Sequence, residues 1–343
     1  MARELRPSER ESVENFVSVG LTAAIVATID DVPCALEVEH QSEERRGGPT
    51  DLTRSGLPFG PFDPHLHRTL ESGLRMWVEE QTKLQLGYVE QLYTFGDRGR
   101  HDQDPDGGLR VLSVGYLALT RRGEGGHAPG TMWRSWYEHF PWEDFRDGRP
   151  ALIDERIAPG LESWLNSSEN SAVERRRDRI RQCFGFYEGP GWDEERVLER
   201  YELLYEAGLI YESLRDRPDA SRGLAAADPR LGLPMIYDHR RILATAMGRL
   251  RAKLKYRPVI FELMPSTFTL YDLQRTVEAI SGVRVHKQNF RRLVETGGLV
   301  EQTGATMQTR GRPAQLFRFR REVLGERPAP GVKLTSPRHT RAK

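Results

Sequence analysis

The chain has almost no cysteine and no long apolar run, and each shortage excludes a class of protein. Cys34 and Cys183 are the only cysteines in 343 residues, which excludes a disulfide framework and a metal knuckle, so we expect two buried, reduced thiols. No run of about 18 apolar residues occurs, and the N-terminal residues are charged from the start. These absences predict a cytoplasmic protein without a membrane span, a secretory signal or a membrane partner.

The chain also lacks a large excess of charge of either sign. The chain has 51 Lys and Arg against 50 Asp and Glu, a formal net charge of +1, so attraction to nucleic acid has to come from local clustering of cations. Neither G-x-G-x-x-G nor G-x-x-x-x-G-K-[ST] occurs, which leaves a dinucleotide fold of the usual type and a P-loop unsupported. An apolar fraction of 38% and the length of the chain predict a globular protein of two domains, or of one large and one small domain.

The first third of the chain alternates strand and helix patterns. Four segments have the apolar, β-branched composition of strands: 17–29, 35–38, 88–95 and 110–119. A helix is predicted over 64–82, because its apolar side chains recur every three to four residues. That buried stripe consists of Leu66, Leu70, Leu74, Trp77 and Val78. Together these elements predict a compact, layered α/β domain.

The middle of the chain is predicted to be a largely helical insertion. Helical patterns lie near 151–165, 172–184 and 193–207, after a glycine-rich loop and an aromatic segment. Core or subunit packing is the commoner role of such aromatic residues, and a ligand cage is the alternative, for Trp133, Trp136, Trp142 and Trp164. The predicted units are an effector-sensing domain over 12–237 with the insertion at about 121–234, an amphipathic linker helix over 238–256, a DNA-binding domain over 257–321 and a disordered basic tail over 322–343.

Residues 57–83 resemble a damaged Nudix box. The pattern is a glycine, five residues, a glutamate, seven residues and then R-E-U-x-E-E-x-G-U with U apolar, and its glutamates hold Mg²⁺ against a pyrophosphate. The chain retains Arg75, Trp77, Glu79 and Glu80, and it departs from the pattern at Pro61, His67, Met76, Thr82 and Lys83. A solvated R-x-x-x-E-E helix explains the same residues about equally well by itself. The upstream LPFGPF turn and the downstream strand QLYTFGD favour the box, because they set the helix between strands.

Met76 is the departure with the largest chemical consequence. It lies four residues before Glu80, on the same helix face, and a thioether offers Mg²⁺ no charged oxygen and cannot act as a base. We therefore expect crippled hydrolysis, no catalytic residue and no required cofactor. Glu79 and Glu80 stay weak candidates to hold one Mg²⁺ beside a bound nucleotide. The predicted effector-binding residues are Phe59, Gly60, Arg75, Glu79 and Glu80.

Residues 257–321 have the pattern of a winged helix-turn-helix. A short helix in RPVIFELM precedes a second helix with Thr269 as N-cap, and a third helix over about 286–295 is basic on one side. Two strands flank the loop TGATMQTRGRPA. Nine basic and two acidic residues over 283–321 give 9 − 2 = +7, an electrostatic footprint for phosphate. The predicted DNA-binding residues are Lys287, Gln288, Asn289, Arg291 and Arg292 on the helix and Arg310 and Arg312 on the wing.

Together these segments resemble the Nudix-related transcriptional regulators of NAD metabolism. The resemblance lies in QLYTFGD, in RVLSVGYLAL, in MIYDHRRIL with the residues up to 282, and in KQNFRRLVETGGLVEQTG with GRPAQLFRF. It implies a Nudix-like α/β/α sandwich with a helical insertion and a C-terminal winged helix. It also implies a homodimeric repressor of NAD synthesis or salvage genes that binds a palindromic operator and senses ADP-ribose or an adenine nucleotide such as ATP.

Two other classes of function stay open at this point. One is an active Nudix hydrolase of nucleoside diphosphate derivatives, whose winged helix only localises it. The other is an interaction scaffold, which includes a winged helix that binds protein or merely has a solvated basic face. Turnover of ADP-ribose with Mg²⁺ would indicate the hydrolase, and absence of nucleic-acid binding at physiological salt would indicate the scaffold.

Overall fold

A mixed seven-stranded sheet organises the N-terminal part of the chain. The computed structural model describes residues 17–40, 55–97, 110–121, 128–167, 170–216, 228–308, 311–326 and 331–332. The strands of the sheet are β1 (Val17–Ile29), β2 (Val32–Glu39), β3 (Ser55–Gly56), β4 (Phe59–Pro61), β5 (Tyr88–Phe95), β6 (Arg110–Leu119) and β7 (Thr131–Ser135). The order is β3-β2-β1-β6-β5, with β4 paired to β1 and β7 to β2. Only β1 and β6 run parallel, and the other pairs are antiparallel.

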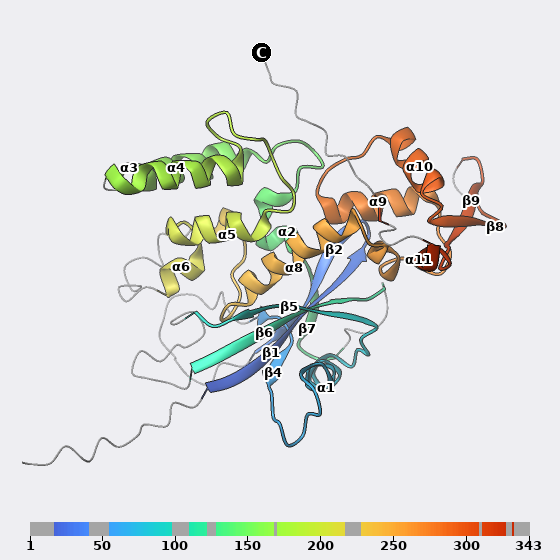
Figure 1. Cartoon of the computed structure of the whole chain (residues 1–343), viewed down its shortest axis with the longest axis horizontal. Helices are drawn as coiled ribbons and strands as arrows, with labels where there is room; N and C mark the ends of the chain where they lie inside the picture. Colours follow the sequence, from blue (N-terminus) through green and yellow to red (C-terminus); the bar gives the residue numbers. More distant parts are fainter. Residues whose placement is uncertain are drawn as a thin grey trace, which may run out of the picture.

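The two faces of the sheet are covered by different helices (Figure 1). Successive side chains of a strand point to opposite faces. Leu21, Ala23 and Ile25 of β1 pack with α1 (Leu70–Thr82), whereas Ala24 and Val26 belong to the core on the other face. The chain therefore has the layered α/β/α architecture predicted from its sequence.

The helical region between β7 and residue 234 lies on the side of the second face and packs largely on α8 (His239–Leu254), the helix that contacts the sheet there. It contains α2 (Trp136–His139), η1 (Pro141–Glu143), the π-helix η2 (Ile153–Ile157), α3 (Ala158–Asn166), α4 (Asn170–Phe184), α5 (Val197–Glu206), α6 (Tyr211–Arg215) and η4 (Pro229–Leu231). The prediction of a helical region is confirmed, but it missed β7, which pairs with β2 from Thr131 to Ser135. Trp136 and Trp142 are fully buried, so core packing is their role, and Trp133 and Trp164 pack partly buried against the cores.

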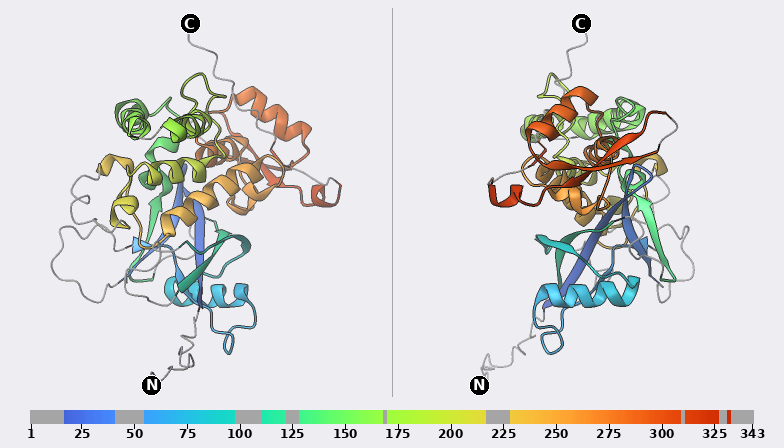
Figure 2. Two further views of the ribbon diagram at one scale, coloured as in Figure 1. Left: turned by 60° about the vertical axis from the view of Figure 1, so that its left-hand side comes forward. Right: turned by 90° about the vertical axis from the view of Figure 1, so that its right-hand side faces the viewer.

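Helix α8 (His239–Leu254) crosses the middle of the molecule (Figures 1 and 2). The predicted helix is confirmed, and the residues of its predicted apolar side are buried. The prediction did not include the further burial of other residues, Arg240 and Arg251 among them, which brings the buried residues to ten of sixteen. The role of α8 as a linker between domains stays a prediction. Apolar side chains from Ala24 of the sheet to Phe317 of the winged helix join in one core cluster around it. The predicted domain boundaries stay a prediction. No helix in the described ranges is both long and apolar enough to cross a membrane.

The C-terminal part forms the predicted winged helix. Its elements are η5 (Val259–Glu262), α9 (Leu270–Ser281), α10 (Lys287–Thr296), β8 (Val300–Met307) and β9 (Ala314–Phe319), and α11 (Val323–Glu326) follows. Thr269 caps α9 in a reciprocal arrangement with Asp272, as predicted. Strands β8 and β9 pair antiparallel and form the wing.

Two predictions about local structure are wrong. Helix α1 begins at Leu70, after the Thr69 N-cap, so Leu66 lies outside it and is 73% exposed. The start of the predicted disordered tail is ordered, since Val323 and Val332 are buried and the Val332 N–H donates to the Leu254 carbonyl. The composition of a segment does not predict that single apolar side chains, such as these two valines, are buried. Residues 327–330 and 333–343 of the predicted tail lie outside the described residues.

Candidate nucleic-acid interface and effector region

Helix α10 presents a cationic face to solvent. Phe290 and Val294, four residues apart, are buried against the winged helix core, which fixes the rotation of the helix. The opposite side chains are exposed and form no hydrogen bond or ion pair within the part of the chain that the structure describes: Lys287, Gln288, Asn289, Arg291 and Arg292. Three cations and two amides on one exposed helix face have the donors to meet phosphate oxygens and base edges in a major groove.

The wing and the turn before α10 contribute less unpaired charge than their composition suggests. Arg318 pairs with Glu301 at 2.5 Å, Arg320 pairs with Glu326, and Arg284 lies 3.0 Å from Glu278. The predicted excess of +7 is therefore partly neutralised locally, whereas Lys287, Arg291 and Arg292 of α10 have no ion-pair partner among the described residues. Arg312 lies exposed before β9, and Arg310 lies outside the described residues.

The segment before α1 is held against the helix because side chains of α1 form hydrogen bonds with the backbone of this segment. The Gln81 side chain accepts from the Phe59 N–H at 3.2 Å and donates to the Phe59 carbonyl at 2.6 Å. Gly60 lies directly under the Trp77 ring, where a β-carbon would overlap the indole. Trp77 Nε1 in turn donates to the Pro61 carbonyl at 2.9 Å. The structure thus brings the LPFG turn and the Nudix-like helix together, as the resemblance implies.

Of the predicted charged effector residues on α1, Glu79 and Glu80 are exposed and Arg75 is half-buried, and Arg75 and Glu79 engage local partners. Arg75 donates to Glu71 at 2.9 Å and to the carbonyls of Leu86 and Gly87, which ties α1 to the start of β5. The Glu79 carboxylate accepts from the Gln85 amide at 3.3 Å. These contacts give the charged side chains a structural role on α1. Their role in binding an effector stays a prediction.

The donor set on α1 does not match a multi-carboxylate magnesium site. Glu79 and Glu80 are neighbours in sequence, so their side chains leave the helix about 100° apart. Met76 is exposed on the same side as Glu80, and His67 is buried, with Nδ1 accepting from the Asp63 N–H at 3.0 Å. Across the described residues, no group of three or more His, Cys, Asp or Glu is placed to hold a metal ion.

An aromatic cluster joins the LPFG turn to the start of α8. The Phe59 ring centroid lies 4.8 Å from that of His40, 5.6 Å from Tyr237 and 5.0 Å from His239. The fully buried His239 accepts from the Leu57 N–H through Nδ1 at 3.0 Å. Tyr237 has a left-handed backbone with φ of 48°, which is strained for a non-glycine residue. In the sequence, Tyr237 and His239 were noted only as part of the MIYDHRRIL segment that resembles the family. No sequence pattern predicted that they would contact Phe59.

A buried polar contact between Glu37 and His139 ties the sheet to the helical region. Glu37 on β2 is fully buried, and its carboxylate lies 2.6 Å from His139 Nε2 and accepts from Ser55 Oγ at 2.5 Å. Burial alone would raise the pKa of Glu37, but the contacts to His139 and Ser55 and the charge of Arg134 outweigh burial and lower it. The periodic pattern of a strand predicts apolar residues at buried positions, so it did not predict that Glu37 would be buried beside His139.

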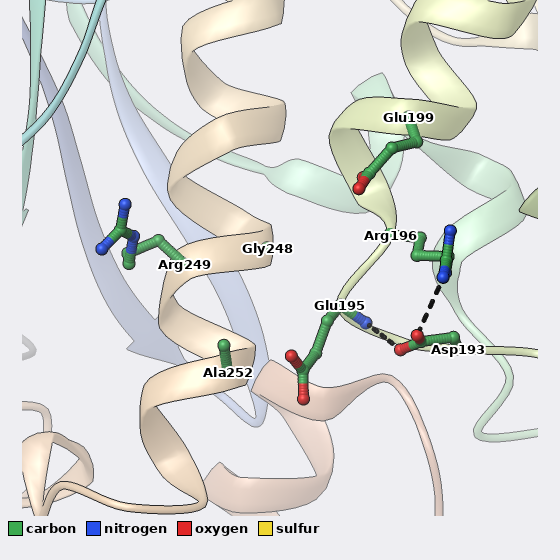
Figure 3. A pocket seen from close by; sticks show the side chains of 7 residues that line it. All are labelled: Asp193, Glu195, Arg196, Glu199, Gly248, Arg249 and Ala252. Carbon is green, nitrogen blue, oxygen red and sulfur yellow. Dashed lines mark hydrogen bonds and ion pairs between the residues drawn. The ribbon is translucent and has the colours of Figure 1, made fainter.

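A hollow of about 340 Å³ lies between α8 and the segment leading into α5 (Figure 3). It is lined by Asp193, Glu195, Arg196, Glu199, Gly248, Arg249 and Ala252, and none of the predicted effector residues lines it. Asp193 already pairs with Arg196 at 3.2 Å, and the hollow is wide open. These properties are those of a solvated groove.

Comparison with known proteins places the winged helix in a family. Residues 260–319 match the model of the NrtR DNA-binding winged helix domain. The ADPR responsive transcriptional repressor NtrR of Acinetobacter baylyi is 40% identical over 89 residues, which are 26% of this chain and 36% of that protein. The match thus spans about a third of the length of that curated relative.

The fold of the whole chain is similar to that of solved NrtR structures. Shewanella oneidensis NrtR in complex with a 27mer DNA has a TM-score of 0.51 at 19% identity, over 90% of this chain and 95% of that one. Shewanella oneidensis NrtR in a second crystal structure also has a TM-score of 0.51 at 19% identity, over 89% and 95%. This chain therefore carries an NrtR-family winged helix domain on a scaffold with the overall fold of NrtR.

Proposed function

We propose that this chain is a ligand-responsive, DNA-binding transcriptional regulator, and that it acts as a repressor. The observation that carries the proposal is the exposed cationic face of α10, within a domain that matches the NrtR winged helix model. Lys287, Arg291 and Arg292 would contact phosphates, and Gln288 and Asn289 would reach base edges in the major groove. We propose that Arg310 and Arg312 on the wing grip the backbone or the minor groove.

We propose that the effector is ADP-ribose or an adenine nucleotide, bound beside the LPFG turn and α1. The name of the Acinetobacter relative states a response to ADPR, and the turn and helix here resemble the corresponding parts of a Nudix domain. The Phe59 ring offers a stacking surface, and Arg75 offers a cation for phosphate. If Mg²⁺ accompanies the nucleotide, Glu79 and Glu80 are the carboxylates that would meet it.

We further propose a homodimer on a palindromic operator near genes of NAD synthesis or salvage. A two-fold dimer presents two copies of α10 about one or more helical turns of DNA apart, which a palindrome matches. A ligand releases DNA only by binding more tightly to the form that does not bind DNA. Effector binding would therefore change the relative placement of the two winged helices.

The test begins with selection of a duplex from a randomised pool by the wild-type chain. Gel-shift titrations of that duplex, with and without ADP-ribose, NAD or ATP at up to about 1 mM, the upper end of typical KM values, then measure the response. We expect duplex binding and a shifted curve with at least one of these nucleotides. If no duplex is selected at physiological salt, the proposal of a DNA-binding regulator is wrong and the interaction scaffold is favoured. Genomic footprinting of the bound sites would name the regulated pathway.

We propose that hydrolysis is weak or absent, because Met76 replaces a carboxylate on the exposed face of α1. Exposed Glu79 and Glu80 are the observation that favours residual activity. Chromatography of ADP-ribose, NADH and nucleoside triphosphates after incubation with protein and Mg²⁺ tests this. Rapid turnover, above about 1 per second as in typical enzymes, would instead identify an active Nudix hydrolase.

A further inference from the structure

The carboxyl end of α9 is held by residues from outside the winged helix. The last carbonyls of a helix have no partner within it, so they need donors from elsewhere. The Ala279 carbonyl accepts from Tyr137 Oη at 2.8 Å, and the Ile280 carbonyl accepts from Arg251 Nε at 2.9 Å. The Gly282 carbonyl accepts from the Phe145 N–H at 2.7 Å. Three anchors within four residues therefore fix the end of the helix that precedes α10.

Behind these anchors lies a buried triad of charges. Glu143, Arg200 and Arg251 are fully buried side chains, and the Glu143 carboxylate accepts from Arg200 Nε at 2.6 Å and from Arg251 Nη1 at 2.7 Å. One carboxylate and two guanidinium groups leave an excess of one positive charge. The carboxyl end of α9 supplies partial negative charge where Arg251 meets it. Because an uncompensated buried charge is costly, the triad favours the docked position of α9.

The other end of α8 rests on the LPFG turn. His239 accepts from the Leu57 N–H at 3.0 Å, and the Ile236 N–H donates to the Ser55 carbonyl at 3.2 Å. A β-carbon on Gly56 would come within 2.5 Å of His239 Nδ1, so the turn and the helix meet without spare room. A displacement of the turn would therefore move the start of α8.

We propose that α8 is the rigid element that couples the LPFG turn to the recognition helix, with Arg251 as the residue that positions α9. The helix spans about 24 Å over its sixteen residues and is buried along most of its length, so it transmits a shift of one end to the other. Only the five residues 282–286, from the Gly282 C-cap to the His286 N-cap, separate α9 from α10, so α10 follows α9. The regulatory consequence rests on the proposed function, whereas the placement of α9 by Arg251 does not.

The experiment measures a distance within the whole chain and compares it with duplex binding. Spin labels are attached at Leu66→Cys and Glu295→Cys, which are exposed, whereas the native Cys34 and Cys183 are buried. Labelled protein is diluted with unlabelled protein so that distances within one chain dominate. Arg251→Met is compared with wild type and with Arg249→Met, a control two residues earlier whose side chain is 44% exposed and lies 3.7 Å from Glu90.

We expect one narrow distance in wild type and in Arg249→Met, and a broadened or displaced distance in Arg251→Met. Duplex affinity should fall about tenfold if about one molecule in ten keeps the competent orientation. The ratio of duplex affinities with and without ADP-ribose should move toward one.

A folded Arg251→Met protein with the wild-type distance would overturn the positioning role, and an altered distance with an unchanged ADP-ribose ratio would overturn the coupling. If Arg251→Met does not fold by circular dichroism, Tyr137→Phe decides in its place, because it removes only the hydroxyl that meets the Ala279 carbonyl. If wild type binds no duplex, the proposed function fails while the distance still decides the role of Arg251.

Discussion

Gly282 lies directly against the backbone of Glu143. A β-carbon on Gly282 would come within 2.5 Å of the Glu143 carbonyl oxygen, and within 2.9 Å of the Tyr137 hydroxyl. Its φ of 74° is in the left-handed region, where glycine is the residue without steric penalty. The close approach shows that the winged helix and the helical region meet at a position that accepts no side chain.

Substitution of Gly282→Ala should therefore lower the free energy of unfolding by about 3 kcal/mol, from backbone strain and a clash with main-chain atoms. Gly304→Ala is the matched control, since Gly304 also has a positive φ of 80° but nothing lies near its β-carbon position. The control should lose only about 1 kcal/mol. Urea unfolding of the three proteins measures both changes. Equal losses in the two variants would mean that the contact at Glu143 relaxes without cost.

The sequence predicted those parts of the fold that depend on interactions between residues close together in the chain, and it missed those that depend on distant residues. The strands at 17–29, 88–95 and 110–119 and the cap at Thr269 were predicted, because composition, periodicity and capping are local signals. Strand β7 was missed, since its partner β2 lies about 97 residues earlier and an aromatic sequence does not reveal the pairing. The extent to which α8 is buried was not predicted, because Arg240 and Arg251 are polar in sequence and buried in the structure.

The candidate site was predicted to a similar extent. The cationic face of α10 followed from helical spacing, and the structure exposes the predicted residues there. Contacts of high sequence separation were not predictable: His139 and Glu37 are 102 residues apart, and Arg251 and Glu143 are 108 residues apart. A buried ion pair leaves no periodic trace, because either residue alone resembles a surface charge.

Neutralising one cation on α10 should weaken duplex binding in a salt-dependent way. Arg292→Ala should cost about 1 kcal/mol and reduce the slope of log affinity against log salt by about one, because one phosphate contact is lost. Arg312→Ala on the wing should likewise weaken binding on all sequences. Arg175→Ala on α4 is the control, since Arg175 is exposed but lies outside the winged helix. Gel shifts at several salt concentrations measure the change, and an unaltered slope would remove the residue from the interface.

Both native thiols should be inert in the folded protein. Burial, followed by the charges of Glu138 and Asp30, raises the pKa of the Cys34 thiol to about 11, and burial raises the pKa of the Cys183 thiol. At pH 8 only about one Cys34 in a thousand is then the reactive thiolate. Absorbance with a disulfide thiol reagent should show no fast reaction in the native protein and two thiols after unfolding. Fast labelling of one thiol under native conditions would contradict the buried positions.

Binding of ADP-ribose should stabilise the folded chain. A ligand present at about 100 times its dissociation constant adds about 2.7 kcal/mol to the free energy of unfolding, which raises the melting temperature. Phe59→Ala should abolish most of this shift if the ring stacks on the ligand, whereas Tyr93→Ala, an exposed aromatic residue on β5, should preserve it. Differential scanning fluorimetry with increasing ADP-ribose measures the shift. An undiminished shift in Phe59→Ala would move the effector site away from the LPFG turn.

Acid should destabilise the protein partly through Glu37. Contacts with His139 on α2, Ser55 on β3 and Arg134 on β7 outweigh burial and lower the pKa of Glu37 below its ordinary value of 4.5. A carboxyl group with a depressed pKa in the folded state stabilises that state fully above its unfolded pKa, and this stabilisation is lost as the pH falls through the folded pKa. The free energy of unfolding should therefore decline between about pH 5 and pH 3. Glu37→Gln should be less stable at pH 7 but decline less over this range, whereas Glu80→Gln, at an exposed position, should follow wild type. Urea unfolding at pH 7, 5, 4 and 3 measures these slopes, and identical acid slopes in Glu37→Gln and wild type would show that the buried carboxylate does not contribute to acid unfolding.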